Sequence, residues 1–365
     1  MNKIKLTYAA YMNSSGFSIA AQNYILALNS TNNFDIKIRV FGEKIKKSAI
    51  SDENYELFMK MVKKEDDPER ILIYHCIPNI QKRIKKYKKT IGFAVFETYS
   101  PPEKWVEILN KNDAIIVPSQ FNYKIFSHMG IKKPIYYIPH CLDMNVYNKK
   151  VNKLKEYDKF TFLFLGTWKE RKGYKVLVEA FLKEFNENEN VQLLIKTDKP
   201  QYAEQYINSI KKQIGINKGF AAINFENRVF DEKDLPKFIK SADCLVSPSL
   251  GEGFGIPGLQ SMALGVPVII TDFAGCQDYA NENTAFLLKP NGFIMKSNMD
   301  NIPQFKNKKW AFIEVSKIRK YMRYVFEHYD MAILKSNCAN YYVKDKFSYA
   351  QIGKLFTTAL KEIYD

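Results

Sequence analysis

The feature that most constrains the fold of this chain is an alternation of short apolar segments with helical ones, which occurs twice. Each apolar segment is five to nine residues long and rich in β-branched and aromatic residues. Such segments with helices between them predict parallel sheets that are covered on both faces. The predicted strands are 3–11, 34–41, 71–76, 91–97, 114–118 and 135–140 in the first series, and 160–166, 191–197, 223–227, 244–249, 267–272 and 284–289 in the second.

A polar stretch at 148–159 separates the two series and is the best linker in the chain. The length of 365 residues also fits two domains, each large enough to bury a core. We therefore predict an α/β protein with two Rossmann-like domains that face a cleft, at 1–150 and 151–344. The last segment, 347–365, is predicted as a helix with Ser348 as its N-cap that returns to the first domain, so that residues from about 345 belong there.

The composition argues against several classes of protein. No apolar run approaches the roughly 18 residues that span a bilayer, and the N-terminal stretch lacks the long apolar region of a signal peptide. The five cysteines are scattered, and none of the four histidines belongs to an HExxH motif. We expect no disulfide framework, no metal and no cofactor, and a cytoplasmic location.

The charge of the chain is strongly basic, with 55 Lys and Arg against 39 Asp and Glu. Residues 1–150 alone carry 24 against 14, with the densest clusters at 82–89 and 44–47. A basic surface attracts an anionic partner such as a membrane lipid or a nucleic acid. The alternative is a solvated Lys-rich helix face. Peripheral binding at the inner membrane face therefore stays open as a second location.

The strongest local motif is a glycine-rich turn between a predicted strand and a predicted helix, in the run SPSLGEGFGIPGLQSMALGVPVIITD at 247–272. Glycines let a backbone approach a ligand closely, and the N–H groups at the start of a helix favour phosphate. A carboxylate at Glu252 can accept two hydroxyl hydrogens from a sugar. An ordinary tight turn is the alternative interpretation of the glycines alone.

The run EGFGIPGLQ resembles the signature of retaining glycosyltransferase family 4, in which two glutamates are separated by seven residues. Glu252 matches the first glutamate, and Gln260 stands in place of the second. The resemblance extends to 162–181 and 263–275 in the second domain, and to 96–143 in the first. It implies the GT-B fold and transfer of a sugar from a nucleoside-diphosphate sugar to an acceptor hydroxyl.

The resemblance also implies roles for residues of the second domain. Lys172 matches the lysine that binds the diphosphate, and Thr167 stands where the family often has an arginine, so Arg171 is the alternative cation. Glu252 is expected to bind donor-sugar hydroxyls, and Gln260 to contact the ribose without charge assistance. The remaining donor-binding candidates lie in the glycine-rich turn or directly after strands: Gly253, Phe254, Gly255, Ile256, Pro257, Lys196, Thr197, Arg228 and Val229.

Four residues of the first domain are further candidates. Gly16 lies in the loop after the first predicted strand, where a glycine allows approach to the pyrophosphate. Glu97 follows a predicted strand and could orient an acceptor hydroxyl. His75 and His140 also end strands and are assigned to the acceptor side, with a structural role in the domain core as the alternative for both.

The function predicted from the sequence is therefore a metal-independent, retaining hexosyl- or pentosyltransferase. Its acceptor is a glycan, a lipid-linked saccharide or a modified DNA base. A degenerate protein that binds sugar nucleotides without turnover is the alternative, because Gln260 and Thr167 depart from the family pattern.

Overall fold

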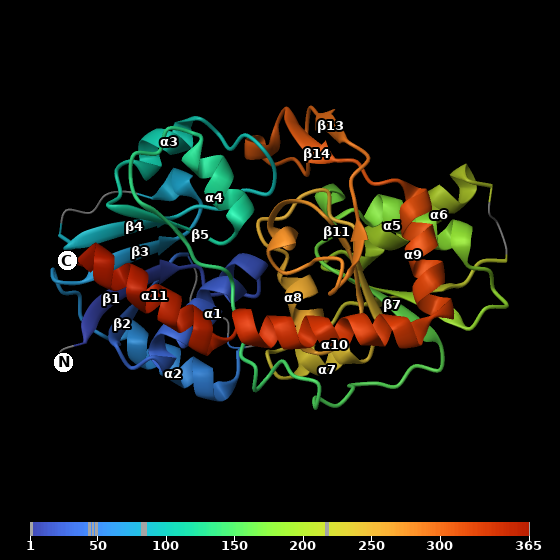
Figure 1. The fold of residues 1–365 in the computed structure, drawn as a ribbon, viewed down its shortest axis with the longest axis horizontal. Coiled ribbons are helices and arrows are strands. Elements are labelled where there is room, and N and C mark those ends of the chain that lie inside the picture. The colour runs from blue at the N-terminus through green and yellow to red at the C-terminus, as the bar shows by residue number, and fades with distance from the viewer. Residues whose placement is uncertain are drawn as a thin grey trace. The chain divides into compact units, whose positions relative to one another are not determined.

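The computed structural model describes residues 3–42, 45, 47, 50–81, 86–215 and 219–364. The chain divides into two compact units (Figure 1). Unit 1 comprises Met1–Val146, Phe230–Lys233 and Lys344–Asp365, and unit 2 comprises Tyr147–Val229 and Asp234–Val343. Lys82, Arg83 and Lys85 of the predicted basic cluster, and Lys44 and Lys46 of the smaller one, lie outside the described residues.

Unit 1 contains a six-stranded sheet in the order β2-β1-β3-β4-β5-β6, and every neighbouring pair is parallel. The interior strands β1 and β3 are almost wholly buried, as expected for continuous apolar strands with helices on both faces. The strands are β1 (Ile4–Ala10), β2 (Phe34–Val40), β3 (Ile71–His75), β4 (Lys89–Phe93), β5 (Ala114–Val117) and β6 (Ile135–Tyr137).

The helices of unit 1 include the last helix of the chain, which packs on the first. Ile352 and Phe356 of α11 belong to the same hydrophobic core as Tyr24 and Ile25 of α1. This confirms the prediction that the C-terminal helix returns to the first domain. The helices are α1 (Gly16–Ser30), α2 (Asp52–Val62), η2 (Pro78–Ile80), α3 (Lys104–Leu109), α4 (Gln120–Ser127) and α11 (Tyr349–Tyr364).

The predicted strand at 91–97 is wrong at its end, because β4 stops at Phe93. Beyond that residue the N–H of Ala94 still bonds to the carbonyl of Ile116. The side chain of Asn122 then bonds both the N–H and the carbonyl of Phe96, at 2.6 and 3.0 Å. A side chain thus replaces the neighbouring strand, and the prediction that Glu97 directly follows a strand is also wrong.

Unit 2 contains a second parallel sheet of six strands, in the order β12-β11-β10-β7-β8-β9. A separate antiparallel ribbon is formed by β13 and β14. The strands are β7 (Phe160–Leu165), β8 (Val191–Lys196), β9 (Ala222–Glu226), β10 (Cys244–Ser247), β11 (Val268–Thr271), β12 (Phe286–Leu288), β13 (Phe293–Lys296) and β14 (Lys308–Ala311).

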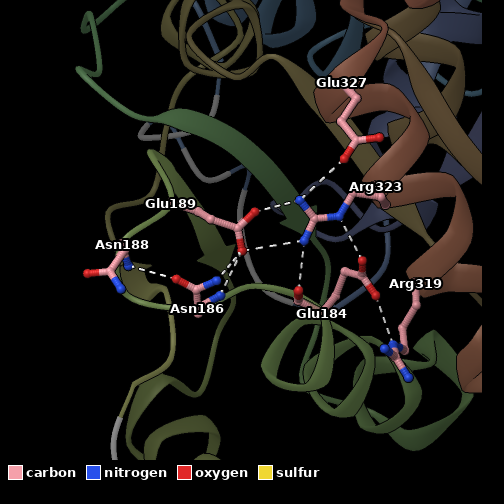
Figure 2. Close-up of polar contacts among 7 residues, drawn as sticks. All are labelled: Glu184, Asn186, Asn188, Glu189, Arg319, Arg323 and Glu327. Carbon is pink, nitrogen blue, oxygen red and sulfur yellow. Dashed lines mark hydrogen bonds and ion pairs between the residues drawn. The ribbon is translucent and has the colours of Figure 1, made fainter.

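One arginine fixes α9 against α5 in unit 2. Figure 2 shows Arg323 between two acidic residues, Glu184 and Glu189. Its Nε donates to Glu184 Oε1 at 2.8 Å, its Nη2 donates to the Glu184 carbonyl at 2.8 Å, and its Nη1 lies 2.5 Å from Glu189 Oε1. The helices of unit 2 are η3 (Glu170–Lys172), α5 (Tyr174–Glu184), α6 (Pro200–Gln213), α7 (Asp234–Lys240), α8 (Ile256–Ala263), η4 (Ala274–Asp278), η5 (Pro303–Phe305), α9 (Val315–Glu327) and α10 (Tyr329–Lys346).

Sequence periodicity did not reveal the β13–β14 ribbon or α10. The ribbon strands are only four residues long and lie in a polar stretch. The apolar residues of α10 are distributed over two faces, so the helix lacks the single apolar stripe that marks α5. Among the described residues, none of the helices has the length and apolar character that crossing a bilayer requires.

Candidate functional site

The candidate site is built at the carboxyl edge of the unit 2 sheet, where β7 and β10 lie side by side. After β10 the chain makes the glycine-rich turn and enters α8 at Ile256, with Pro257 in the first helical turn. Gly255 has φ of +90°, a conformation that side-chain-bearing residues rarely adopt. A Cβ on Gly255 would lie 2.7 Å from the hydroxyl of Tyr279, which donates to the Gly255 carbonyl at 2.5 Å.

The second loop of the site follows β7 and contains η3. Gly173 ends η3 with φ of +74°, and a Cβ there would lie 1.9 Å from the carbonyl oxygen of Pro248. The N–H of Leu250 also donates to the carbonyl of Arg171 at 2.7 Å. This close contact between the two loops requires glycine at 173, and it brings the cations of η3 to the turn that carries Glu252.

Glu252 is the centre of a buried charged cluster. Its Oε1 accepts hydrogen bonds from Lys172 Nζ and from Ser249 Oγ, the latter at 2.9 Å. Its Oε2 lies 3.4 Å from Nη1 of Arg171. Burial opposes ionisation of this carboxyl, but the charges of Lys172 and Arg171 outweigh that effect and lower its pKa. The structure therefore holds an ionised carboxylate and two cations together in the interior of the loop cluster.

Arg171 has a second acidic neighbour that the sequence prediction missed. Asp300, in the connection between β13 and β14, accepts from the backbone N–H of Arg171 at 3.4 Å and lies 3.6 Å from its Nε. Its side chain is only 1% exposed, and its φ is +57°. Lys296 of β13 also pairs with Glu170 at 3.1 Å. The ribbon thus fixes η3 from outside the sheet, and the left-handed backbone at an aspartate is a feature that only the structure reveals.

The turn itself packs against η4. The N–H of Gly275 donates to the carbonyl of Glu252 at 3.0 Å, and a Cβ on Gly275 would lie 2.1 Å from the Gly253 oxygen. Gly253 and Phe254 are buried, whereas Gly255, Ile256 and Pro257 are half-buried. The segment predicted to bind sugar and phosphate through its amides is therefore held rigidly at the start of α8.

Gln260 is also placed by the structure, one turn into α8. Its side chain is buried, and its Nε2 donates to the hydroxyl of Tyr147 at 2.8 Å. The amide nitrogen thus contacts the first residue of unit 2. The predicted contact between the amide oxygen of Gln260 and a ribose stays a prediction.

The other donor-side candidates lie along β7, β8 and β9, which are neighbours. Lys196 is the last residue of β8 and is half-buried; burial lowers its pKa, and the carboxylates of Glu226 and Asp198 partly offset this. Thr197 is buried and bonds Asp198 at 3.2 Å. Thr167 is exposed after β7. Arg228 and Val229 are exposed after β9, where Arg228 pairs with Glu226 at 2.6 Å.

The unit 1 candidates do not gather into one group. Gly16 is exposed at the first position of α1, and there is open space around it. Glu97 is half-buried, four residues beyond β4. His75 and His140, by contrast, lie within 6 Å of the ring of Tyr24, at 5.7 and 5.3 Å between ring centroids.

The two histidines are core residues of unit 1. Tyr24 donates to the carbonyl of Ile138 at 2.6 Å, so its oxygen accepts from Nδ1 of His140 at 2.9 Å. His75 is stacked on Phe93 with 4.0 Å between the centroids, and its Nδ1 is bonded to Tyr8 at 2.8 Å. Burial lowers the pKa of His140 to about 3 and places that of His75 well below its usual range. Both rings are therefore neutral at pH 7.

Part of the second unit matches a family of known proteins. Residues 159–298 match the family described as Glycosyl transferases group 1, a range that includes η3, Lys172, Glu252 and the glycine-rich turn. These residues are therefore similar to glycosyl transferases group 1. Asp300 lies just beyond the matched range.

A larger part of the chain resembles individual known proteins. An uncharacterized glycosyltransferase of Methanocaldococcus jannaschii is 26% identical over 273 residues, which are 65% of this chain and 64% of that relative. Two further curated relatives are matched over 58% and 64% of their own length. The chain thus spans less than two thirds of the length of these relatives.

Solved structures match almost the whole chain. Alr3699/HepE of Anabaena, in a complex with UDP and glucose, has a TM-score of 0.73 at 13% identity and covers 98% of this chain and 100% of its own. Sucrose-phosphate synthase of Thermosynechococcus elongatus has a TM-score of 0.68 at 14% identity, with 98% and 99% covered. At these identities the likeness shows the fold, which is GT-B, as the sequence predicted.

In the described part of the chain, His, Cys, Asp and Glu do not form a group of three or more suited to holding a metal ion. The acidic residues of the site, Glu252 and Asp300, are instead neutralised by Arg171 and Lys172. The prediction that no metal takes part is a separate matter and needs a solution experiment.

Proposed function

We propose that this protein is a retaining glycosyltransferase of family 4 that moves a hexosyl or pentosyl group from a nucleoside-diphosphate sugar to an acceptor hydroxyl. The observation that carries the proposal is the cluster of Lys172, Arg171 and Glu252. It places two cations and one ionised carboxylate beside the amides of a glycine-rich turn. The group 1 match over the same residues and the UDP and glucose bound to Alr3699/HepE support it.

The cluster suits a diphosphate leaving group. Lys172 and Arg171 supply the positive charge that a developing diphosphate requires, and the amides at the start of α8 add hydrogen-bond donors. Glu252, which contacts both cations in this structure, accepts hydroxyl hydrogens of the donor sugar once the diphosphate takes the cations as partners. When the donor binds, Lys172 and Arg171 exchange the carboxylate of Glu252 for the diphosphate as their partner. Each cation therefore has an anionic partner both before and after binding.

The transfer step follows from this arrangement. The bond from the anomeric carbon to the diphosphate oxygen breaks, and a bond from the same face of that carbon to the acceptor oxygen forms. The acceptor proton passes to the departing diphosphate oxygen, so the diphosphate serves as base and the configuration is retained. Lys172 and Arg171 stabilise the charge that remains.

We also propose that the reaction needs no metal, because the two cations supply the charge that a divalent ion would otherwise provide. Activity that survives a chelator supports this, and activity lost to the chelator and restored by Mg²⁺ contradicts it. The acceptor is a glycan, a lipid-linked saccharide or a modified DNA base. Residues 1–150 carry an excess positive charge of +10, which supports an anionic acceptor or an anionic surface as the binding partner. We therefore place the enzyme in the cytoplasm, at the inner membrane face.

A thermal-shift screen of nucleoside diphosphates and their sugars tests the proposal. A ligand at about 100 times its dissociation constant stabilises the native state by about 2.7 kcal/mol, so the preferred donor raises the melting temperature most. We expect Glu252→Gln to remove the extra shift given by the sugar while retaining most of the shift given by the bare diphosphate. Glu282→Gln is the matched control, because Glu282 is an exposed partner of Lys289 in the same unit. If Glu252→Gln gives the same thermal shifts as the wild type and the Glu282→Gln control, the site assignment is refuted.

A second function, nucleotide-sugar binding without turnover, is favoured by one observation. Gln260 replaces the second glutamate of the family pattern, and its amide nitrogen is engaged by Tyr147. Tight donor binding combined with neither transfer to any acceptor nor hydrolysis of the donor would establish this function. Release of free nucleoside diphosphate that depends on Lys172 would instead support the transferase.

A further inference from the structure

The helix α10, which lies in unit 2 up to Val343, carries apolar residues on two nearly opposite faces. One face contains Ala332, Ser336, Ala339 and Val343, all of which are buried within the protein. The other contains Met331, Leu334, Cys338 and Tyr341, all of which are exposed. At about 100° per residue these two stripes are centred about 150° apart. The second stripe, which we call the outer stripe, is therefore directed away from the core that holds the helix.

The outer stripe is large for a solvated surface. Met331 is 46% exposed, Leu334 57% and Tyr341 77%. Single exposed apolar residues are ordinary, but four in a row along one helix face expose a continuous patch. Its members are spaced by three, four and three residues, which is the a and d spacing by which helices pair.

The helix is well fixed on its own unit, so the stripe is presented on a rigid support. Asn340 donates to the Ala263 carbonyl at the end of α8 at 2.5 Å, and Lys149 bonds the side chain of Asn337. The preceding helix α9 is fixed by the Arg323 cluster (Figure 2). A second helix can thus dock on the stripe without refolding of this region.

We propose that the outer stripe is a self-association surface, on which α10 of a second copy of this chain packs in antiparallel orientation. The spacing is symmetric about position 336. A twofold axis there places Met331 opposite Tyr341 of the second copy, and Leu334 opposite Cys338 of the second copy. An isologous contact requires this self-complementarity.

One pair of charges beside the stripe favours the same arrangement. Asp330 and Lys344 are exposed and both occupy the g position of the heptad that has Met331 at a. In an antiparallel pair the g positions face one another, so Asp330 of each copy lies opposite Lys344 of the other. The twofold axis produces this favourable contact twice.

A lipid bilayer suits the stripe less well. Helices that lie in a membrane interface have a broad apolar face bordered by Lys and Arg. The outer stripe covers only about 80° of the helix circumference. Asp330 and Asn337 lie along one edge of it, and Asp345 continues it beyond Tyr341. Mixed charge at the edges of a narrow stripe is typical of helix pairing.

Analytical ultracentrifugation of the full chain tests the proposal. The contact involves one helix per copy and is smaller than the interfaces of about 1,200 Å² or more that hold stable pairs. We therefore expect a monomer–dimer equilibrium between about 1 and about 100 µM. Leu334→Asp should leave only monomer, whereas Leu355→Asp, at a residue on α11 that is 45% exposed, should leave the equilibrium unchanged.

Charge reversal distinguishes pairing from a defect within the helix. We expect Asp330→Lys to weaken dimerisation at least about tenfold, and the double variant Asp330→Lys with Lys344→Asp to restore it. Both single changes oppose the helix dipole, so a helix defect would make the double variant worse than either single one. Failure of the double variant to recover overturns the antiparallel pairing.

Oxidative crosslinking tests the register. The cysteines at 76, 141, 244 and 276 are buried, so Cys338 is the exposed thiol among the five. Leu334→Cys should form a crosslinked dimer through Cys338 of the second copy and lose it when Cys338→Ser is added.

A wild-type protein that stays monomeric at about 100 µM overturns the proposal. Sedimentation of such a monomer with anionic phospholipid vesicles, lost in Leu334→Asp, would assign the stripe to lipid.

Discussion

Replacement of Lys172 by methionine tests the charged cluster most directly. The side chains of Lys172 and Glu252 are only 16% and 9% exposed, so the variant leaves a buried carboxylate without its nearest cation. Breaking a buried ion pair by removing one partner costs roughly 3–5 kcal/mol. Arg171 at 3.4 Å and Ser249 at 2.9 Å remain as partners of Glu252 and offset part of this cost. We therefore expect a net loss of about 2–3 kcal/mol.

Chemical or thermal unfolding at pH 7 measures this loss. For a unit of this size, 1 kcal/mol corresponds to roughly 2–4 °C, so unit 2 should melt about 4–12 °C lower. Adding Glu252→Gln removes the stranded charge and should recover about half of the loss. The control is Lys175→Met, because Lys175 pairs with Glu170 at the surface with its side chain 44% exposed. Solvent screening limits that loss to about 0.5 kcal/mol or less.

The change of stability with pH is a second, independent test of the same cluster, because its direction differs between the wild type and Lys172→Met. In the wild type the pKa of Glu252 is lowered, so its contribution to stability is present above its unfolded pKa of about 4.3 and is lost as the pH falls through the folded pKa. In Lys172→Met burial dominates and raises the pKa, so stability is instead lost as the pH rises through it. The reasoning is refuted if Lys172→Met unfolds within about 0.5 kcal/mol of the wild type and Glu252→Gln gives no recovery.

Two further predictions concern the loop contact and the core of unit 1. Gly173→Ala should lower the free energy of unfolding by roughly 3 kcal/mol or more, because its Cβ would lie 1.9 Å from the Pro248 oxygen. The control is Gly292→Ala, where φ is +102° and the space around the Cβ is open. In the same unfolding assay it should cost about 1 kcal/mol. Because the folded pKa values of His75 and His140 are lowered, their contribution to stability is lost as the pH falls below about 6.5. Unit 1 should then lose roughly 1.4 kcal/mol per pH unit for each histidine, and a variant carrying His140→Gln that unfolds with the wild-type pH dependence would contradict this.

The site shows how far local patterns extend. The glycines at 253 and 255 and the apolar segment before them predicted a glycine-rich turn after a strand, and the family resemblance singled out Lys172. The structure places that turn after β10 and Lys172 after β7. Asp300 was missed because it stands in a polar stretch with no periodicity, and only the ribbon between β13 and β14 brings it to Arg171. The strand end at Phe93 was misplaced for a related reason. The bond from Asn122 to Phe96 joins segments 26 residues apart, and no local pattern records it.

The amino-acid sequence by itself determined that this chain forms two parallel sheets, since continuous apolar strands can be buried only between two layers of helices. It also determined which turns carry glycine, because positive φ and close backbone approach exclude a side chain. Only the tertiary structure decided that Lys172 contacts Glu252, since this depends on β7 pairing with β10 across 80 residues of chain. The tertiary structure likewise decided which apolar face of α10 is buried. Both faces carry apolar residues in the sequence, and only the elements that pack against the helix determine which of them is covered.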